Sequence, residues 1–358
     1  MVRESVVHAG ANPIKLIQIL RESIAAELRE EFSVLVPLAR DADIVVGAGL
    51  IGAASSAAEA AGIPFRYVAY FPELFPSRHH APVLVPHRGL PSWINRMAWA
   101  TTKPIIDWIP REAMNKERAA IGLAPLDRVS VHVMPPERTL FAMDPEIAPL
   151  AADMVASHPP TGSWRLPDER PLGEKLEAFL RAGPPPVYVG FGSMPDKDPA
   201  KTTHAIVEAA RNVGCRILIS AGWADIGGVE ATDTLLAIDA VPHDKLFPRV
   251  AVVVHHGGAG TSTAAARAGV PQIIVPHILD QFAWARRIHR LGLGPAPLPK
   301  AKFDAASLAA RLEEALKTSV FLQLLRVCAK ESKAVTASPT RSRFFLRWWP
   351  LFERRPQP

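Results

Sequence analysis

The fold is decided by the stretch VAVVVHHGGAGTST at positions 250–263. Its apolar first half predicts a buried strand, and its glycine-rich second half predicts a tight turn that opens a helix. Glycines let backbone N–H groups approach a bulky anion, and the N-terminus of a helix favours negative charge. Thr261 or Ser262 can cap this helix, Gly269 ends it, and Pro271 prevents its continuation. The stretch therefore predicts a strand–turn–helix junction suited to a diphosphate.

A plain strand–helix turn capped by His256 fits the same spacing, because glycine turns are common. The turn itself has neither the Gly-x-Gly-x-x-Gly spacing of dinucleotide sites nor a phosphate-loop lysine. Two other turns carry polar groups: Ser193 follows a predicted strand, and Asp280 and Gln281 begin a predicted helix. A carboxylate beside an amide can accept from and donate to adjacent sugar hydroxyls. Taken singly, each turn is also explained as an ordinary loop or helix cap.

Composition excludes several classes of protein. The chain has 358 residues, 48% of them hydrophobic and 21% charged, which is typical of a soluble protein with two domains. Its two cysteines form no disulfide framework or metal spacing, which favours a reducing, cytoplasmic location. The N-terminus does not resemble a signal peptide, and no uncharged apolar run is long enough to span a membrane. The net charge of +6 lies wholly in residues 326–358, so the body shows no footprint for nucleic acid.

Apolar strand-like runs alternate with helical patterns, which predicts an α/β fold with mainly parallel sheets. The expected strands are 43–49, 64–70, 138–143, 187–191, 216–220, 235–238, 250–254 and 272–275, and the expected helices are 52–61, 91–120, 199–213, 261–268 and 280–291. We expect an N-terminal domain at 1–158, a linker at 159–170, a second domain at 171–325 and a basic-aromatic tail at 326–358. Ligands bind such sheets at the carboxyl ends of the strands.

Several motifs occur in one order along the second domain: Gly190-Phe191-Gly192-Ser193-Met194, Ser220-Ala221-Gly222-Trp223, Val241-Pro242-His243, His255 to Thr261, Ala268-Gly269-Val270-Pro271 and Asp280-Gln281. This ordered set resembles the C-terminal domain of the GT-B glycosyltransferases of the glycopeptide-antibiotic, macrolide and sterol 3-beta-glucosyltransferase group. The resemblance is dense over 186–292 and looser over 43–165. It implies two facing, doubly wound Rossmann-like domains.

The resemblance also implies a role for each site residue. The donor diphosphate is assigned to Ser193, His256, Gly257, Gly258, Ala259, Gly260 and Thr261, the nucleotide to Trp223 and Val241, and the donor sugar to Asp280 and Gln281. Such enzymes use a UDP- or dTDP-sugar and need no metal or other cofactor, because the helix dipole and the histidine replace it. The pairs Asp41/Asp43 and Asp196/Asp198 have Asp-x-Asp spacing, but we do not predict a metal at either.

Members of this group open with a Gly-Ser-Arg-Gly-Asp-like turn that carries the catalytic base, and this chain contains no such turn. We therefore expect a truncated first domain, with the base in a missing N-terminal segment. The histidines His79 and His80 lie in what the group would make an acceptor-side loop.

The predicted activity is inverting transfer of a hexosyl or deoxyhexosyl group to a hydroxyl of a hydrophobic small molecule or lipid. The alternatives are a non-catalytic nucleotide-sugar-binding remnant and a nucleotide-sugar epimerase of similar build. The tail either touches an anionic membrane or is a disordered or frame-shifted end.

Overall fold

The computed structural model describes residues 13–49, 51–83, 85, 89–154, 156, 158–192, 194, 196–220 and 229–317. They form two compact units. Unit 1 takes the described residues of Met1–Met143 and Leu150–Thr161, and unit 2 takes Asp144–Pro149 and those from Gly162 onward. No described helix combines the length and the apolar character that crossing a bilayer requires.

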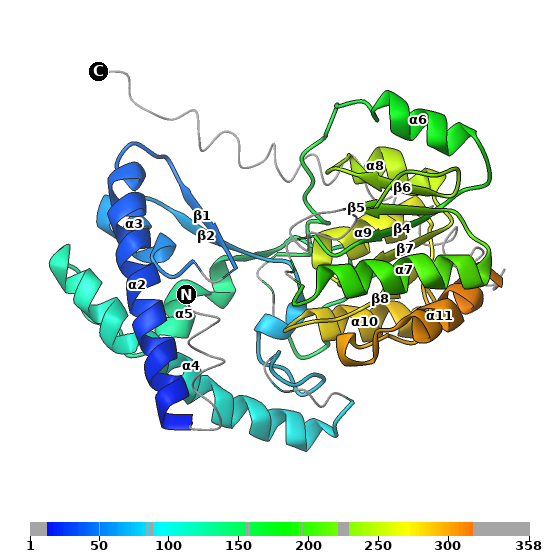
Figure 1. Cartoon of the computed structure of the whole chain (residues 1–358). Coiled ribbons are helices and arrows are strands. Elements are labelled where there is room, and N and C mark those ends of the chain that lie inside the picture. Colours follow the sequence, from blue (N-terminus) through cyan, green and yellow to red (C-terminus); the bar gives the residue numbers. More distant parts are fainter. Residues whose placement is uncertain are drawn as a thin grey trace. The chain divides into compact units, whose positions relative to one another are not determined.

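Unit 1 is built on a parallel sheet of three strands in the order β1-β2-β3 (Figure 1). The strands are β1 (Val45–Ala48), β2 (Phe65–Ala69) and β3 (Thr139–Phe141), and the helices are α2 (Pro13–Ala39), α3 (Ala54–Ala61), α4 (Ser92–Ala120) and α5 (Val129–Val133), with 3-10 turns η1 (Pro72–Leu74) and η2 (Pro136–Arg138). Gly62 ends α3 in the left-handed region, with φ +66°, where glycine carries no Cβ penalty. The chain then returns as β2, parallel to β1, as the alternating pattern predicts.

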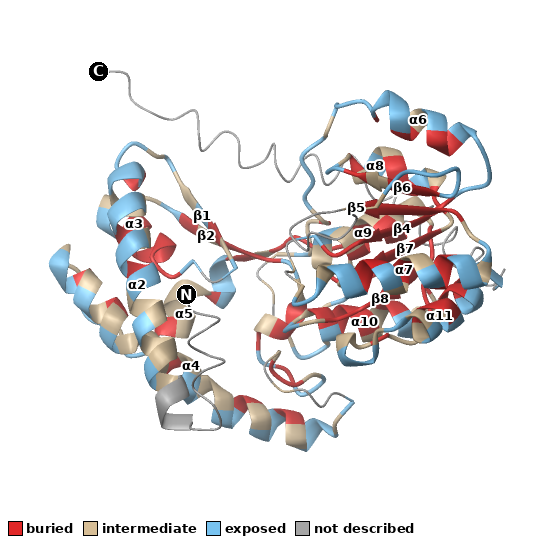
Figure 2. Cartoon of the chain, in the orientation of Figure 1, coloured by how far each residue is buried: buried red, intermediate tan, exposed pale blue. Residues whose placement is uncertain are grey.

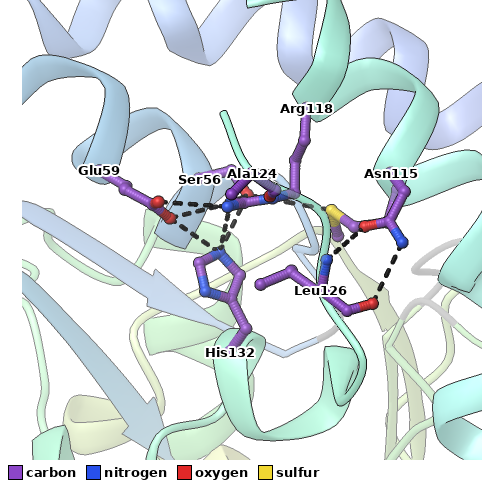
Figure 3. Close-up of polar contacts among 8 residues, drawn as sticks. Ser56, Glu59, Asn115, Arg118, Ala124, Leu126 and His132 are labelled. Atoms are coloured by element: carbon purple, nitrogen blue, oxygen red, sulfur yellow. Dashed lines mark hydrogen bonds and ion pairs between the residues drawn. The ribbon is translucent and has the colours of Figure 1, made fainter. Parts of the chain in front are cut away.

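A buried arginine joins three helices of unit 1 (Figure 3). The Arg118 guanidinium donates to both carboxylate oxygens of Glu59, at 2.9 and 3.1 Å, to Ser56 Oγ at 2.9 Å and to the Ala124 carbonyl at 2.8 Å. His132 Nε2 lies 2.9 Å from Ser56 Oγ. Because a buried charge is costly unless paired, the network holds α3, α4 and α5 in one arrangement.

The Ser56, His132 and Glu59 side chains resemble a catalytic triad only in composition. Ser56 Oγ and Glu59 Oε2 both face the same imidazole nitrogen, Nε2, at 2.9 and 3.8 Å. A triad requires the serine and the carboxylate on opposite ring nitrogens. Ser56 is also fully buried, so we interpret the cluster as structural.

Unit 2 is built on a parallel sheet of five strands in the order β6-β5-β4-β7-β8. The strands are β4 (Val187–Gly190), β5 (Ile217–Ser220), β6 (Leu235–Ile238), β7 (Val252–His255) and β8 (Gln272–Ile274). The helices are α6 (Glu174–Arg181), α7 (Pro199–Val213), α8 (His243–Leu246), α9 (Ala259–Ala268), α10 (Gln281–Arg290) and α11 (Ala305–Lys317), with 3-10 turns η4 (Phe247–Arg249) and η5 (Lys300–Lys302).

Both faces of the second sheet are buried, and its strands are almost entirely red in Figure 2. Val187 and Val189 belong to the core that α7 and α11 cover, whereas Tyr188 belongs to the core on the α6 and α9 side. This alternation explains why the strands read as continuous apolar runs rather than as alternating patterns. The predicted α/β class with parallel sheets is confirmed.

Candidate functional site

The loops with the predicted site residues leave the same edge of the second sheet. Gly190, the last residue of β4, is in register with Ser220 on one side and His255 on the other. His255 is in turn aligned with Ile274 of β8. The chain runs outward from β4 through β5 and β6, then returns to β7 on the other side of β4. The turns after β4 and β7 therefore flank the topological switch point, where such sheets bind ligands.

These two turns are in contact. A Cβ built on Gly192, whose φ is +58°, would lie 3.2 Å from His256 Cε1. Glycine at 192 thus lets the β4 turn approach the histidine of the β7 turn closely. The predicted diphosphate residue Ser193 lies next along the chain and outside the described residues.

Each glycine of the turn after β7 is required, or not required, by a different structural feature. Gly257 has φ +92°, and a Cβ there would lie 2.6 Å from Ile274 Cγ2. A Cβ on Gly258 would lie 2.5 Å from His256 Nε2, so this glycine makes room for the imidazole. A Cβ on Gly260 would meet none of the described residues within 4 Å, although glycine weakens a helix. Contacts within the described part of the chain therefore do not explain Gly260.

Helix α9 begins at Ala259, two residues earlier than predicted. Its N-cap is Gly258, so the expected capping by Thr261 or Ser262 is wrong. The Ser262 N–H already donates to the Gly258 carbonyl, at 3.0 Å. The amides of Ala259, Gly260 and Thr261 precede it in the first turn, where N–H groups have no acceptor inside the helix. A helix that begins without a side-chain cap presents these donors to an anion.

His256 adds a side-chain donor to this group of amides. Its Nδ1 is buried and, among the residues that the structure describes, has no hydrogen-bond partner. Burial, assisted by the nearby His277, lowers the pKa of His256 to about 4. The imidazole is therefore neutral at pH 7 and carries one N–H that it can donate to a phosphate oxygen.

The loop after β8 carries the predicted sugar-binding pair. Gln281 is buried, and its Oε1 accepts from the backbone N–H groups of His277, at 2.7 Å, and Ile278, at 3.1 Å. Its Nε2 lies 3.2 Å from Met194 Sδ, which ties this loop to the β4 turn. Asp280 is the N-cap residue of α10, yet within the described residues its carboxylate makes no capping hydrogen bond. The amide therefore shapes the loop, and the carboxylate is not used to cap the helix.

A cavity of about 540 Å³ lies within unit 2, beside Ala264 and Arg267 in the C-terminal half of α9. It is lined by Ser163, Arg165, Leu166, Pro167, Asp168, Val241, Pro242, His243, Asp244, Ala264 and Arg267. Val241, the predicted nucleotide contact, is among them, whereas Trp223 lies outside the described residues. The sequence does not predict that residues 163–168 line this cavity, because the linker has no regular pattern of apolar and polar residues.

Both Asp-x-Asp aspartates of unit 2 are engaged by the protein. Asp196 accepts from Lys300 Nζ at 2.6 Å and from Thr202 Oγ1 at 2.8 Å. Asp198 caps α7 by accepting from the Lys201 N–H at 3.0 Å. In the described part of the chain, no three His, Cys, Asp or Glu side chains are grouped as metal ligands.

A second glycine-rich junction lies in unit 1, where Gly47-Ala48-Gly49-Leu50-Ile51-Gly52 has the Gly-x-Gly-x-x-Gly spacing between β1 and α3. At this helix start, a carboxylate of the protein takes the place that a bound anion would occupy. Glu31 Oε2, from α2, accepts from the Ala53 N–H at 2.9 Å. A Cβ on Gly52 would lie 2.7 Å from Leu28 Cδ2, so this glycine serves the packing of α2. We interpret this junction as a capped structural turn.

A parallel sheet covered on both faces, with an uncapped, glycine-rich helix start at its switch point, defines a Rossmann-like nucleotide-binding unit. The chain can be placed more narrowly by its relatives. A family model described as "Erythromycin biosynthesis protein CIII-like, C-terminal domain" matches residues 208–340.

Three relatives show which enzymes the chain is similar to. "Glycosyltransferase GtfC" of Amycolatopsis orientalis is 39% identical over 296 residues, covering 81% of this chain and 71% of the relative. The "Vancomycin aglycone glucosyltransferase" of the same organism is 39% identical over 310 residues, with coverages of 84% and 74%. "Sterol 3-beta-glucosyltransferase UGT80B1" of Arabidopsis thaliana is 39% identical over 156 residues, or 43% of this chain and 25% of the plant protein.

The fold is also that of solved glycosyltransferases. The structure of glycosyltransferase VinC in complex with dTDP matches with a TM-score of 0.59 at 22% identity, covering 91% of this chain and 79% of VinC. The chain belongs to the family of GT-B glycosyltransferases that includes the glycopeptide-antibiotic enzymes. The resemblance inferred from the ordered motifs is thereby confirmed, as is the class of enzyme.

Proposed function

We propose that this glycosyltransferase transfers a hexosyl or deoxyhexosyl group from a UDP- or dTDP-sugar to a hydroxyl of a hydrophobic acceptor, with inversion at the anomeric carbon. The observation that carries the proposal is the start of α9, which has no side-chain cap, beside the buried His256 Nδ1, which has no hydrogen-bond partner among the described residues. Three amides and one imidazole N–H converge where a diphosphate can accept from them.

The rest of the donor follows from this position. The diphosphate accepts from the amides of Ala259, Gly260 and Thr261, while Gly257 and Gly258 shape the turn. The motif resemblance assigns Ser193 to the same diphosphate. The nucleoside occupies the 540 Å³ cavity, where the Val241 backbone meets the base. The motif resemblance also assigns Trp223 to the nucleotide; that residue lies outside the described part of the chain. The sugar lies toward Asp280 and Gln281, at the other end of the diphosphate. VinC binds dTDP, and this supports a nucleoside diphosphate as the ligand of the shared fold.

We propose that no metal is needed. The diphosphate charge is balanced by the α9 amides, the helix dipole and His256. The one carboxylate pair of unit 2 with metal-like spacing is held by Lys300 and by the α7 cap. Activity that persists unchanged in excess EDTA supports this, and activity restored only by Mg²⁺ or Mn²⁺ contradicts it.

The acceptor class is proposed from the relatives. Their names specify the vancomycin aglycone and a sterol, and both of these compounds carry a hydroxyl group that can accept a sugar. The proposed setting is the cytoplasm, with the tail 326–358 touching anionic lipid; the tail lies outside the described residues. Sedimentation with vesicles rich in anionic lipid, compared with neutral ones, tests the lipid contact.

The test uses the full chain. Calorimetry with UDP and dTDP measures donor binding, and transfer is followed with UDP-glucose or a dTDP-sugar and a sterol or glycopeptide aglycone, with product stereochemistry read by NMR. Binding with transfer and an inverted anomeric centre supports the proposal. Binding without transfer to any acceptor supports the non-catalytic alternative instead. Binding of neither nucleotide contradicts both, and conversion of a UDP-sugar without acceptor indicates an epimerase.

A further inference from the structure

The residue before His256 is a second histidine, which the proposed function does not use. His255 is the last residue of β7 and is fully buried. Its Nδ1 accepts from the Gly257 N–H at 3.1 Å, and its Nε2 lies 2.9 Å from Gln272 Oε1. Gln272, also fully buried, donates through Nε2 to the Ser262 carbonyl at 3.1 Å. A continuous chain of hydrogen bonds therefore runs from the glycine-rich turn through β8 into α9.

The chain of hydrogen bonds has one direction. The Gly257 amide can only donate, so His255 Nδ1 must be the acceptor, and the proton of the neutral ring lies on Nε2. That proton is donated to Gln272 Oε1, which in turn orients the Gln272 NH₂ group toward the Ser262 carbonyl. Burial lowers the pKa of His255 to about 3, so the ring stays neutral in the working range of pH. The Gly257 N–H, the His255 Nε2–H and the Gln272 NH₂ group each have an acceptor, and buried polar networks satisfied in this way fix a single arrangement.

We propose that His255 and Gln272 are positioning residues for donor binding, which hold the turn so that the amides of α9 face the diphosphate. The inference rests on the proposed function. His255 accepts from the Gly257 N–H and so fixes the turn, in which Gly257 has φ +92°. Gln272 fixes the first turn of α9 relative to the sheet by holding the Ser262 carbonyl. The amides of Ala259, Gly260 and Thr261 are then aimed before the ligand arrives, so their orientation is not lost as entropy on binding.

Single substitutions can remove chosen hydrogen bonds from this network. His255→Leu and Gln272→Met remove its hydrogen bonds with little change in volume. His255→Asn keeps an acceptor, because its Oδ1 takes the place of Nδ1 near the Gly257 N–H, but it does not reach Gln272. Val253→Ala, a fully buried change on the same strand, is the control for loss of stability alone.

The experiment measures the ratio of dissociation constants for nucleoside monophosphate and diphosphate, UMP against UDP and dTMP against dTDP, in the full chain. We expect His255→Leu and Gln272→Met to reduce this ratio at least tenfold, because the β-phosphate gains less from misaligned amides. His255→Asn should retain more of the ratio than His255→Leu. Val253→Ala should lower the melting temperature without changing the ratio.

Two outcomes separate this inference from the proposed function. If the wild type binds no nucleoside diphosphate, the proposed function itself is wrong. If the wild type binds and the ratio is unchanged in Gln272→Met or in His255→Leu, the positioning role is overturned and the chain of hydrogen bonds is only structural. Should His255→Leu fail to fold, Gln272→Met and His255→Asn decide the question, because each leaves one end of the chain intact.

Discussion

At the scale of single residues, the glycines of the β7 turn look interchangeable in the sequence but differ in the structure. A side chain at Gly257 or Gly258 would collide with Ile274 or His256, whereas one at Gly260 would meet none of the residues that the structure describes. We predict that Gly260→Ala raises the free energy of unfolding by up to about 1 kcal/mol, because alanine favours a helix. The same methyl group would obstruct the diphosphate, so UDP or dTDP affinity should fall about tenfold or more.

The control for this change is Gly258→Ala. Its Cβ would displace the His256 ring, so both stability and affinity should fall. Urea denaturation and calorimetry on the two variants measure both quantities. A Gly260→Ala protein that binds nucleoside diphosphate as tightly as the wild type would show that the ligand does not approach α9 there.

The protonation of His256 gives a second test at this scale. Its pKa of about 4 in the free protein, which is lowered mainly by burial, must rise beside a diphosphate, because negative charge stabilises the imidazolium. Binding therefore takes up protons at pH values between about 4 and the higher pKa of the complex. We predict greater proton uptake by the wild type than by His256→Asn at pH 6, measured by calorimetry in buffers of different ionisation enthalpy. Equal uptake would place the diphosphate away from this ring.

Loss of the His256 side chain should also weaken binding directly. We predict that His256→Ala reduces nucleoside diphosphate affinity by about 1–3 kcal/mol, the usual effect of losing a hydrogen bond to a charged group. The nucleoside monophosphate should be affected less. An unchanged affinity would refute the assignment of His256 to the diphosphate.

At the scale of elements, most strands and helices of unit 2 could be predicted, because capping residues and glycines in the sequence mark many of their ends. Helix α7 has the predicted bounds, 199–213, since Asp198 caps it and Gly214 ends it with φ +70°. Helix α9 was predicted two residues short, because Gly258 caps it with no side chain to mark the start. Local chemistry therefore located the turns but not their first helical residue.

Long-range contacts account for what the sequence did not reveal. Helix α2 buries Leu28 and Phe32 four residues apart, yet its polar face gives no sign that Glu31 caps another helix. The Arg118 network joins residues up to 76 positions apart, and the His255–Gln272 bond spans 17. Their partners are set by the register of the strands and the packing of the helices, which no local pattern encodes.

The Arg118 network makes a prediction about acid stability. Burial, with the Arg118 charge as the second cause, lowers the pKa of His132 to about 4, from the usual 6.5 of a histidine side chain. The unfolded chain therefore binds a proton that the folded one does not as pH falls from 6.5 to about 4, and stability is lost in that window. His132→Gln should reduce the pH dependence of the unfolding free energy there by up to about 1.4 kcal/mol per pH unit.

Urea denaturation at pH 7, 6 and 5 measures this slope. His204→Gln is the matched control, because that side chain is 81% exposed and lies outside the Arg118 network. The control should keep the slope of the wild type. Parallel slopes for His132→Gln and the wild type would mean that His132 is protonated equally in both states.

At the scale of the whole molecule, the chain passes between its two compact units more than once. The short segment Asp144–Pro149 follows the last strand of unit 1 but belongs to unit 2. Asp144 explains why: its carboxylate accepts from Arg267 of α9 at 2.6 and 2.7 Å and from the Ser163 N–H at 2.9 Å. One carboxylate thus fixes the linker onto the helix whose other end forms the proposed diphosphate site.

Loss of the Asp144–Arg267 ion pair should reduce stability strongly, because the two side chains are only 3% and 13% exposed. We predict that Asp144→Ala lowers the free energy of unfolding by about 3–5 kcal/mol, since it leaves the Arg267 charge buried without its partner. The double variant Asp144→Ala/Arg267→Met should recover part of this loss by removing that charge. Urea denaturation of the wild type and both variants measures the effect. If the single variant loses less than about 1 kcal/mol, or the double variant is the less stable, then the linker is held by contacts other than this ion pair.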